Sequence, residues 1–178
     1  MTDHAKYYKF LCLSQSVPAV KQQQPNWCWA ACMEWWSQAM KGGRPALSQA
    51  AIFNTFKTQA ESDGAISVLN LATVLRTASW RANVDVIQAH ASEGVCLPAA
   101  PGLKLLMTRL ASGPVILGYY HLAVSARGAH AIVVVAPSSS YEGEFVIMEP
   151  DRGAFTHRKY SFLRSVNCNP IVLASPRT

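Results

Sequence analysis

The chain has 178 residues, of which 50% are hydrophobic and 15% charged. This composition excludes an intrinsically disordered protein and indicates a well-packed core. The length suits one domain, so we expect residues 1–178 to form a single unit. The net charge of +6 is spread thinly along the chain. Without a stripe of basic and aromatic residues, it favours a solubilising surface over nucleic acid as a partner.

The N-terminal residues lack the pattern of a cleaved signal peptide. No apolar run approaches the roughly 20 residues that a membrane helix needs. We therefore expect a soluble protein with no membrane partner, which leaves its cell, if at all, without a cleaved leader. The five cysteines are odd in number and irregularly spaced, which favours free thiols over a disulfide framework.

Helices are predicted in the first half of the chain. The first covers residues 27–40 and ends at the Lys-Gly-Gly sequence of 41–43. The second follows Ser48, a suitable N-cap, and the third lies within residues 65–78. One face of the third helix is expected to carry Ile66, Leu69, Leu71, Val74 and Leu75. Alternating apolar and polar residues over 82–89 then predict a short strand.

Strands dominate the second half. An Ala-, Gly- and Pro-rich joint at 91–102 and a short helix at 103–112 come first. The apolar segments that follow are 115–120, 130–137, 144–150, 155–162 and 170–175. A turn-forming sequence at 138–143 predicts a hairpin between two of them. Helices followed by an antiparallel sheet are typical of an α+β fold, with a helical half of about 1–96 and a sheet half of about 97–178.

The sequence KQQQPNWCWAAC at 21–32 contains the candidate nucleophile. Pro25 and Asn26 place Cys28 at the start of the predicted helix, where the partial positive charge and free N–H groups stabilise a thiolate. A thiolate that attacks a carbonyl also needs donors for the developing oxyanion. Gln22 lies six residues earlier. Its neutral amide can fold back beside the N–H of Cys28, which would give an oxyanion hole with two donors.

A candidate base lies at the start of the strongly apolar strand predicted at 130–137. His130 begins that strand, and the next strand ends near Glu149 and Asp151. Adjacent antiparallel strands bring the start of one beside the end of the next. Either carboxylate could therefore accept a hydrogen bond from the His130 ring and fix its tautomer. His121 is the rival base, but no acid follows its strand, and surface positions are expected for His4, His90 and His157.

Other interpretations of the cysteines and tryptophans remain open. Cys28 could be a buried structural thiol. Cys32, one helical turn later, could form half of a zinc site with it, but no further ligand motif is present, so we expect Cys32 in the core. Trp27 and Trp29 flank Cys28 and are candidates for substrate contacts, although Trp27 could simply pack. The remaining tryptophans of this helix, Trp35 and Trp36, are expected to be buried or half-buried.

Three segments in order resemble the motifs of papain-like cysteine peptidases. They are Q-x5-C-W-A-A at 22–31, G-A-H-A-I-V-V-V at 128–135 and F-V-I-M-E-P at 145–150. The resemblance is strongest to the compact bacterial branch, which includes secreted effectors and the leader peptidases of bacteriocin exporters. It implies an α+β papain-like fold, with the active-site cleft between the helical half and the sheet half.

The resemblance also implies roles for individual residues. Gln22 would build the oxyanion hole, Cys28 would be the nucleophile, His130 the base and Glu149 the group that orients it. The family usually has Asp or Asn in this last position, which keeps Asp151 as an alternative. Lysosomal members carry a cysteine where this chain has Pro25, and their Cys-to-His spacing of roughly 130–150 residues exceeds the 102 residues found here. Those differences exclude a lysosomal cathepsin.

The implied activity is hydrolysis of peptide bonds in a protein or peptide substrate, with no metal or cofactor. The implied biology is a bacterial toxin or effector that acts in the cytoplasm of a target cell and is neutralised by an immunity protein in the producing cell. Other thiol enzymes on this scaffold, namely a deamidase, a transglutaminase-like enzyme or a peptidoglycan amidase, stay open. A non-catalytic peptide-binding module also stays open.

Overall fold

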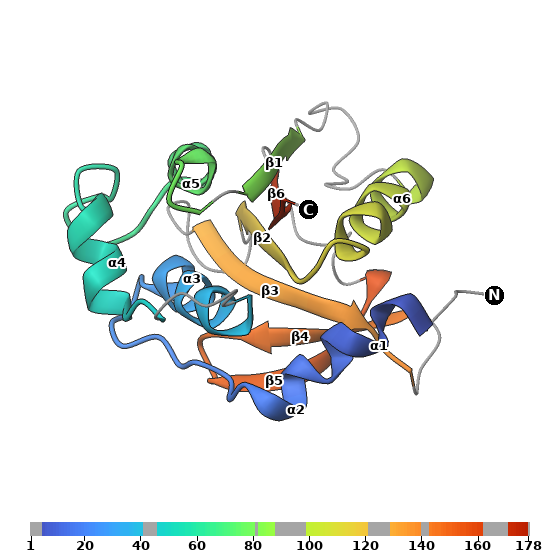
Figure 1. The fold of residues 1–178 in the computed structure, drawn as a ribbon. Helices are drawn as coiled ribbons and strands as arrows, with labels where there is room; N and C mark the ends of the chain where they lie inside the picture. The colour runs from blue at the N-terminus through green and yellow to red at the C-terminus, as the bar shows by residue number, and fades with distance from the viewer. Residues whose placement is uncertain are drawn as a thin grey trace.

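A six-stranded antiparallel sheet lies at the centre of the computed structural model (Figure 1). The structure describes residues 5–40, 46–80, 82–87, 99–120, 129–139, 143–161 and 171–177. The strands are β1 (Ala82–Ile87), β2 (Val115–Tyr120), β3 (Ala129–Pro137), β4 (Glu144–Glu149), β5 (Ala154–Lys159) and β6 (Ile171–Pro176). Their order is β1-β6-β2-β3-β4-β5, so the last strand of the chain pairs with the first. All the predicted strands are present, and the architecture is α+β as expected.

Six helices surround this sheet in the part of the chain that the structure describes. They are α1 (Ala5–Leu11), α2 (Leu13–Ser16), α3 (Cys28–Ala39), α4 (Gln49–Phe56), α5 (Val68–Arg76) and α6 (Ala99–Leu110). The N-cap predicted at Ser48 is confirmed, because its side chain accepts the N–H of Ala51. Helix α6 begins four residues before the predicted start, inside the expected joint. The rest of that joint, and the Lys-Gly-Gly stop at 41–43, lie outside the described residues.

The buried face of α5 differs from the prediction at Leu69 and at Ile66, which is buried but precedes the helix. Leu71 and Leu75 are buried as expected, but Leu69 is 50% exposed. Val74 is buried as well, in agreement with the prediction. The helix begins at Val68, directly after the Ser67 cap, and its buried residues are Val68, Leu71, Ala72, Val74 and Leu75. Leu69 lies outside this stripe and faces solvent.

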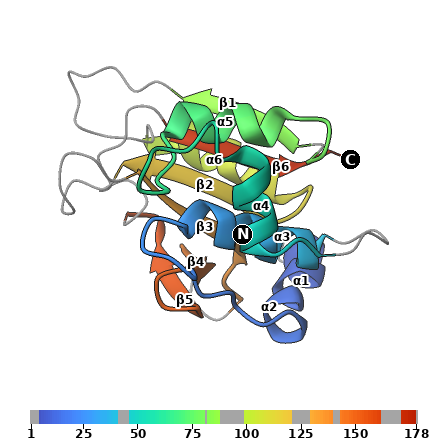
Figure 2. The same ribbon diagram turned by 90° about the vertical axis from the view of Figure 1, so that its left-hand side faces the viewer.

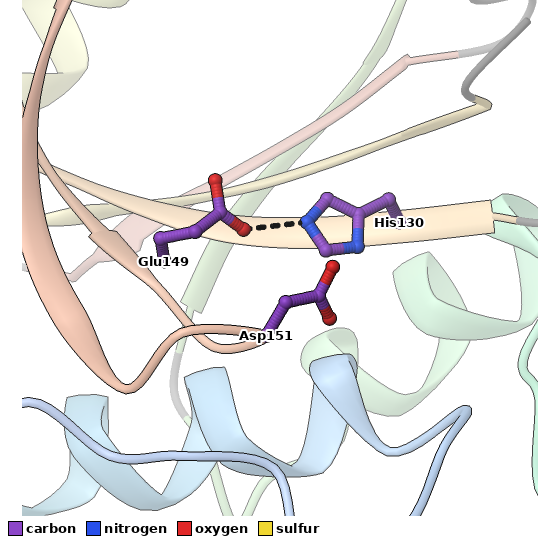
Figure 3. Close-up of side chains that lie close together, drawn as sticks. All are labelled: His130, Glu149 and Asp151. Atoms are coloured by element: carbon purple, nitrogen blue, oxygen red, sulfur yellow. Dashed lines mark hydrogen bonds and ion pairs between the residues drawn. The ribbon is translucent and has the colours of Figure 1, made fainter. Parts of the chain in front are cut away.

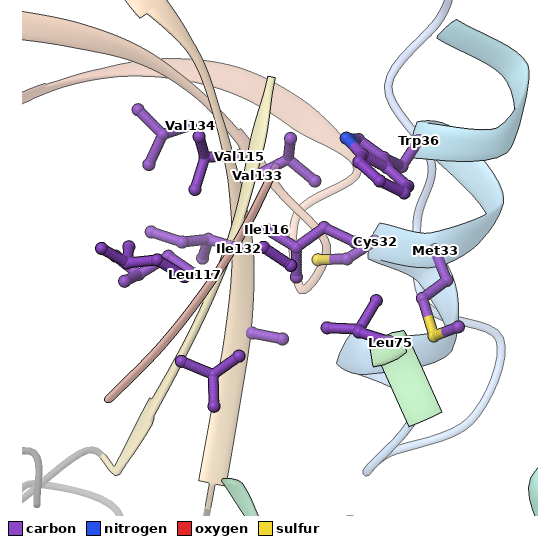
Figure 4. Packing of buried hydrophobic residues seen from close by; sticks show 14 of the residues in the cluster. Cys32, Met33, Trp36, Leu75, Val115, Ile116, Leu117, Ile132, Val133 and Val134 are labelled. Atoms are coloured by element: carbon purple, nitrogen blue, oxygen red, sulfur yellow. The ribbon is translucent and has the colours of Figure 1, made fainter. Parts of the chain in front are cut away.

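Helix α3 packs its buried face against the sheet and fixes the position of its own N-terminus. Figure 4 shows Cys32 and Trp36 pointing from α3 towards the strands that carry Ile116 and Ile132, with Met33 on the side of Leu75. Cys32 is fully buried, so the prediction that it belongs to the core is confirmed. Burying a large apolar side chain stabilises the fold by about 1.5–3 kcal/mol. The α3–sheet contact therefore holds the helix rigidly.

Two tryptophans anchor the far end of α3. The Nε1–H of Trp36 donates to the carbonyl of Pro114 over 2.8 Å. Trp35 meets Phe155 of β5 edge to face, with 5.9 Å between the ring centroids. Both indoles are buried as predicted.

Helices α3, α4 and α5 lie on the side of the molecule that faces the reader in Figure 2. Helix α4 packs against α3, whereas α5 packs against β1, β2 and β6. Within the described residues, no helix combines the length and the apolar character needed to cross a membrane.

Candidate active site

Cys28 is the first residue of α3 and points at the start of β3. The N–H of Trp27 donates to the carbonyl of Pro25 over 2.9 Å, which makes a turn immediately before the helix. The Cys28 thiol lies 3.9 Å from the carbonyl oxygen of Ala129. Its side chain is 6% exposed. The nucleophile candidate therefore sits at the positive end of the helix dipole and beside the residue that precedes His130.

His130 and Glu149 lie on neighbouring strands and contact each other directly (Figure 3). The Nε2 atom of His130 is 2.8 Å from Oε1 of Glu149. A carboxylate can only accept, so the ring nitrogen donates. Both side chains are largely buried, at 17% and 11% exposure. The contact is thus shielded from water and fixes the orientation of the imidazole.

A β-bulge decides that these two side chains share a face. From the hairpin end, Pro137 pairs with Phe145, but after an irregularity between Val134 and Ala136 the register shifts by one, and Val133 pairs with Met148. Continuing this register sets Glu149 opposite Ile132, which is on the same face as His130 because side chains alternate along a strand. Without the extra residue, Glu149 would point to the opposite face of the sheet.

The environment of His130 favours its charged form. Burial by itself lowers the pKa of the imidazole, but hydrogen bonds with Cys28 and Glu149 and the charges of both groups outweigh burial and raise the pKa of His130 to about 10. The ring is therefore protonated at neutral pH. Since Glu149 engages Nε2, the other ring nitrogen is left for Cys28 or Asp151. A cation held between a sulfur and a carboxylate is the arrangement that stabilises a thiolate.

Asp151 also reaches this site from the turn after β4. One potential ligand atom from each of His130, Glu149 and Asp151 falls within 4.8 Å of the others. Asp151 is exposed, whereas Glu149 is buried. One imidazole and two carboxylates are also donors that a metal accepts. The raised pKa of His130 suits the group to proton handling.

The backbone of Gln22 binds the turn that follows β4, from which Asp151 reaches the site. Its N–H donates to the carbonyl of Pro150 over 2.9 Å, which attaches the segment before α3 to the turn that follows Glu149. Gly153 permits this approach: its φ is +63°, and a Cβ atom there would lie 2.6 Å from Cβ of Lys21. Oε1 of the half-buried Gln22 is shielded from solvent without a hydrogen-bond partner among the described residues. The structure thus brings the Gln22 segment to the His130–Glu149 end of the sheet.

The two tryptophans that flank Cys28 have different environments. Trp27 is half-buried and stacks on Phe53, with 4.5 Å between the ring centroids. Trp29 is 1% exposed, and its Nε1–H donates to the carbonyl of Gly64 over 3.1 Å. An indole with no accessible surface cannot contact a substrate. This burial corrects the sequence-based assignment of Trp29, which belongs to the core beneath the site, and leaves Trp27 as the candidate.

Tyr119 is a residue of this site that the sequence did not reveal. It pairs with His130 across β2 and β3, and the two rings meet edge to face with centroids 5.6 Å apart. This packing limits rotation of the imidazole. The two apolar strands suggest a hairpin in the sequence, but their register depends on the connecting loop, so the ring opposite His130 could not be named. A second such residue is Gln49, which binds the backbone on either side of Gln22.

The remaining candidates from the sequence lie away from the site or outside the described residues. His157 is an exposed residue of β5 with Nδ1 4.0 Å from Oε2 of Glu144, in agreement with its predicted surface position. His4, His90 and His121 lie outside the described residues. Burial, together with the charges of Cys28, Glu149 and Asp151, raises the pKa of Cys32 well above its usual value. Cys32 therefore stays a protonated thiol at neutral pH. Cys28, in contrast, has the protonated His130 as its partner.

Comparison with solved structures finds similar folds at low sequence identity. The peptidase domain of Streptococcus ComA, a bifunctional ABC transporter involved in a quorum-sensing pathway, matches with a TM-score of 0.60 at 14% identity, over 90% of this chain and 99% of that chain. The N-terminal peptidase C39-like domain of the toxin secretion ATP-binding protein from Vibrio parahaemolyticus gives 0.47 at 11% identity, over 88% and 99%. The sequence matches no family model and no curated protein. On the first of these similarities, the chain has the α+β fold of papain-like cysteine peptidase domains.

Proposed function

We propose that this protein is a papain-like cysteine peptidase that cleaves peptide bonds with Cys28, His130 and Glu149. The observation that carries the proposal is the charged chain of contacts from Cys28, at the N-terminus of α3, through His130 to the buried Glu149, 2.8 Å from the ring. The likeness in fold to a solved peptidase domain supports the same conclusion. Trp27, half-buried beside Cys28, is assigned to the substrate-binding surface.

The chemistry begins with attack of the Cys28 thiolate on the carbonyl carbon of the substrate. A C–S bond forms, and the carbonyl electron pair moves onto oxygen, where the amide of Gln22 and the N–H of Cys28 stabilise it. As the oxyanion collapses, the C–N bond breaks and His130 gives its proton to the leaving nitrogen. Glu149 remains a carboxylate and keeps the ring oriented.

The thioester is then hydrolysed with the same groups. Neutral His130 takes a proton from a water molecule while that water attacks the thioester carbon. Collapse of this second oxyanion breaks the C–S bond and releases the acid. The cycle ends with Cys28 as a thiolate and His130 protonated, so protons and charges balance without a metal or cofactor.

We further propose that the substrate is a protein of a target cell and that the peptidase is a toxin or effector with a cognate immunity protein. The support is the sequence resemblance at 22–31, 128–135 and 145–150 to the branch that contains secreted effectors. The experiment below tests the activity and identifies the substrate proteins. A pull-down from the producing cell tests the immunity protein, and recovery of no small partner would count against this role.

The decisive experiment maps new protein N-termini in a bacterial lysate treated with the wild-type protein or with Cys28→Ala. We expect new N-termini, concentrated in few proteins, with the wild type and none with Cys28→Ala, whose melting temperature should stay close to wild type. Cys12→Ala is the matched thiol control and should cleave like the wild type. Deamidated side chains without new N-termini would instead indicate a thiol amidohydrolase. If nothing changed and Cys28 reacted with iodoacetamide no faster than free cysteine, the chain would be a binding module.

A further inference from the structure

We propose that Gln49 is a positioning residue that holds Gln22, the oxyanion-hole glutamine, in place against the nucleophile helix. The inference rests on the proposed function, because Gln22 has this role only in an acyl-transfer enzyme. Gln49 is the first residue of α4 and is 1% exposed. A buried amide is costly unless it is hydrogen-bonded, and both the nitrogen and the oxygen of the Gln49 amide have partners.

Both ends of the Gln49 amide bind the backbone on either side of Gln22. Its Nε2 donates to the carbonyl of Lys21 over 2.9 Å. Its Oε1 accepts the N–H of Gln23, also over 2.9 Å. Between these two contacts, the N–H of Gln22 donates to Pro150. Three consecutive residues are therefore fixed, and the one in the middle carries the proposed oxyanion donor.

The same amide ties this segment to the helix that carries Cys28. Nε2 of Gln49 donates a second hydrogen bond to Oε2 of Glu34, over 2.9 Å. Glu34 lies on α3, six residues after Cys28. One side chain thus links α3, α4 and the segment before α3, and so sets the position of Gln22 relative to Cys28.

An amide is the group that these contacts require. The carbonyl of Lys21 and the carboxylate of Glu34 need donors, while the N–H of Gln23 needs an acceptor, and a glutamine offers both. A glutamate would lose both donors and bring a second negative charge towards Glu34. An oxyanion donor contributes only when it is directed at the place where charge develops, so a small displacement of the Gln22 backbone would weaken it.

The test is acylation of Cys28 by p-nitrophenyl acetate, measured as the burst of p-nitrophenolate. The thiolate forms a bond to the acetyl carbon, and p-nitrophenolate leaves with the electron pair after an oxyanion has formed. Gln22→Ala should slow this burst by about 100-fold, as for loss of one oxyanion donor. We expect Gln49→Met, which keeps the length of the side chain without hydrogen bonds, to slow it by roughly 10-fold, since Gln22 is misplaced but present.

Two further measurements separate positioning of Gln22 from a general structural effect. In the Gln22→Ala background, Gln49→Met should cause no additional loss, because the group through which it acts is gone. Alkylation of Cys28 by iodoacetamide at pH 6 displaces iodide at a saturated carbon and forms no oxyanion. Its rate should stay within about twofold of wild type in each variant. Gln38→Met, the same substitution near the C-terminal end of α3, should leave both rates unchanged.

Several results would overturn the inference. They are a Gln49→Met burst at the wild-type rate, a further 10-fold loss in the double variant, or alkylation slowed as much as acylation. If Gln49→Met fails to fold, Gln49→Asn takes its place with the same expected pattern, because its shorter amide stays polar but cannot reach Lys21, Gln23 and Glu34 together. A wild-type protein that reacts with the ester no faster than Cys28→Ala would instead overturn the proposed function, and this inference with it.

Discussion

His130 is held between a sulfur and a carboxylate, and its charge depends on both. The ring is buried, which disfavours the imidazolium, yet its two hydrogen-bond partners keep it protonated. Tyr119 packs edge to face against the ring and restricts its rotation. The imidazole can therefore act as a general acid without reorienting, because its proton already points to the place where it is needed.

The raised pKa of His130 predicts how activity depends on pH. The general acid is the protonated ring, so acyl transfer should persist at neutral pH and fall as pH rises through about 10. Glu149→Gln removes a charge and a hydrogen bond that raise this pKa, so the alkaline fall should move to lower pH. Asp151→Asn should move it less, because Asp151 is exposed. The pH profile of cleavage of a peptide that carries a site found by mapping new N-termini measures both shifts, because a leaving amine needs the proton of His130, whereas p-nitrophenolate does not.

The comparison of these two variants decides which carboxylate orients the ring. If Asp151→Asn moved the alkaline fall further than Glu149→Gln, Asp151 would be the third member of the triad. If neither variant moved it, no carboxylate would control the charge of His130.

At the scale of elements, the site is a junction of the N-terminus of α3, the ends of β3 and β4, and the turn at 150–153. Gly153 allows this turn to lie against the segment that carries Gln22. Its φ of +63° is one that other residues adopt at a cost, and its missing side chain leaves room for Lys21. The turn therefore holds the segment that carries Gln22 beside the end of β4, where Glu149 lies.

Replacing Gly153 by Ala should destabilise the protein and weaken acylation together. The left-handed backbone costs about 1–2 kcal/mol, and contact with Lys21 adds to it. Gly143→Ala is the matched control: its φ is +74°, but a Cβ there would meet no described atom within 4 Å. Urea unfolding should show the larger loss for Gly153→Ala, and only this variant should slow acylation. If both variants lost the same free energy of unfolding and acylated at the wild-type rate, the close approach of Gly153 to Lys21 would be unimportant for stability and for the site.

Local signals predicted most of the elements. Ser48 and the turn at Pro25 gave the starts of α4 and α3, because caps and turns depend on neighbours a few residues away. Helices α1 and α2 were not predicted: they have 7 and 4 residues, too few for a periodic pattern. Leu69 was placed on the wrong face. Successive residues of a helix lie about 100° apart, so Leu69 is turned away from the neighbouring Val68, which is buried.

For the whole molecule, the core joins the two ends of the chain. The buried cluster extends from Tyr7 of α1 to Ala174 of β6, and β6 lies between β1 and β2. We propose on this basis that residues 1–178 fold as a single domain.

A single domain predicts one cooperative unfolding transition in which every probe reports the same midpoint. Leu173→Ala, in the fully buried part of β6, should destabilise the whole protein by about 2–5 kcal/mol. The fluorescence of the α3 tryptophans should report the full shift, although the substitution lies in the last strand. Leu69→Ala, at the half-exposed position on α5, should change stability by less than about 0.5 kcal/mol. A tryptophan transition unaffected by Leu173→Ala would indicate two independent units.

The sequence by itself determined the local features of this protein. The start of the nucleophile helix at Cys28, the N-cap at Ser48 and the series of apolar strands follow from backbone sterics and hydrogen bonds between near neighbours. The resemblance added the order of Gln22, Cys28, His130 and Glu149, and with it the fold.

Only the tertiary structure decided how these parts meet. The bulge between Val134 and Ala136 turned Glu149 to the face of His130, packing buried Trp29, and the contacts of Gln49 bound the segment around Gln22. Each depends on strand register or on partners tens of residues away. Such partners leave no periodic trace in the sequence, because many pairings satisfy the same local pattern until the whole core is packed.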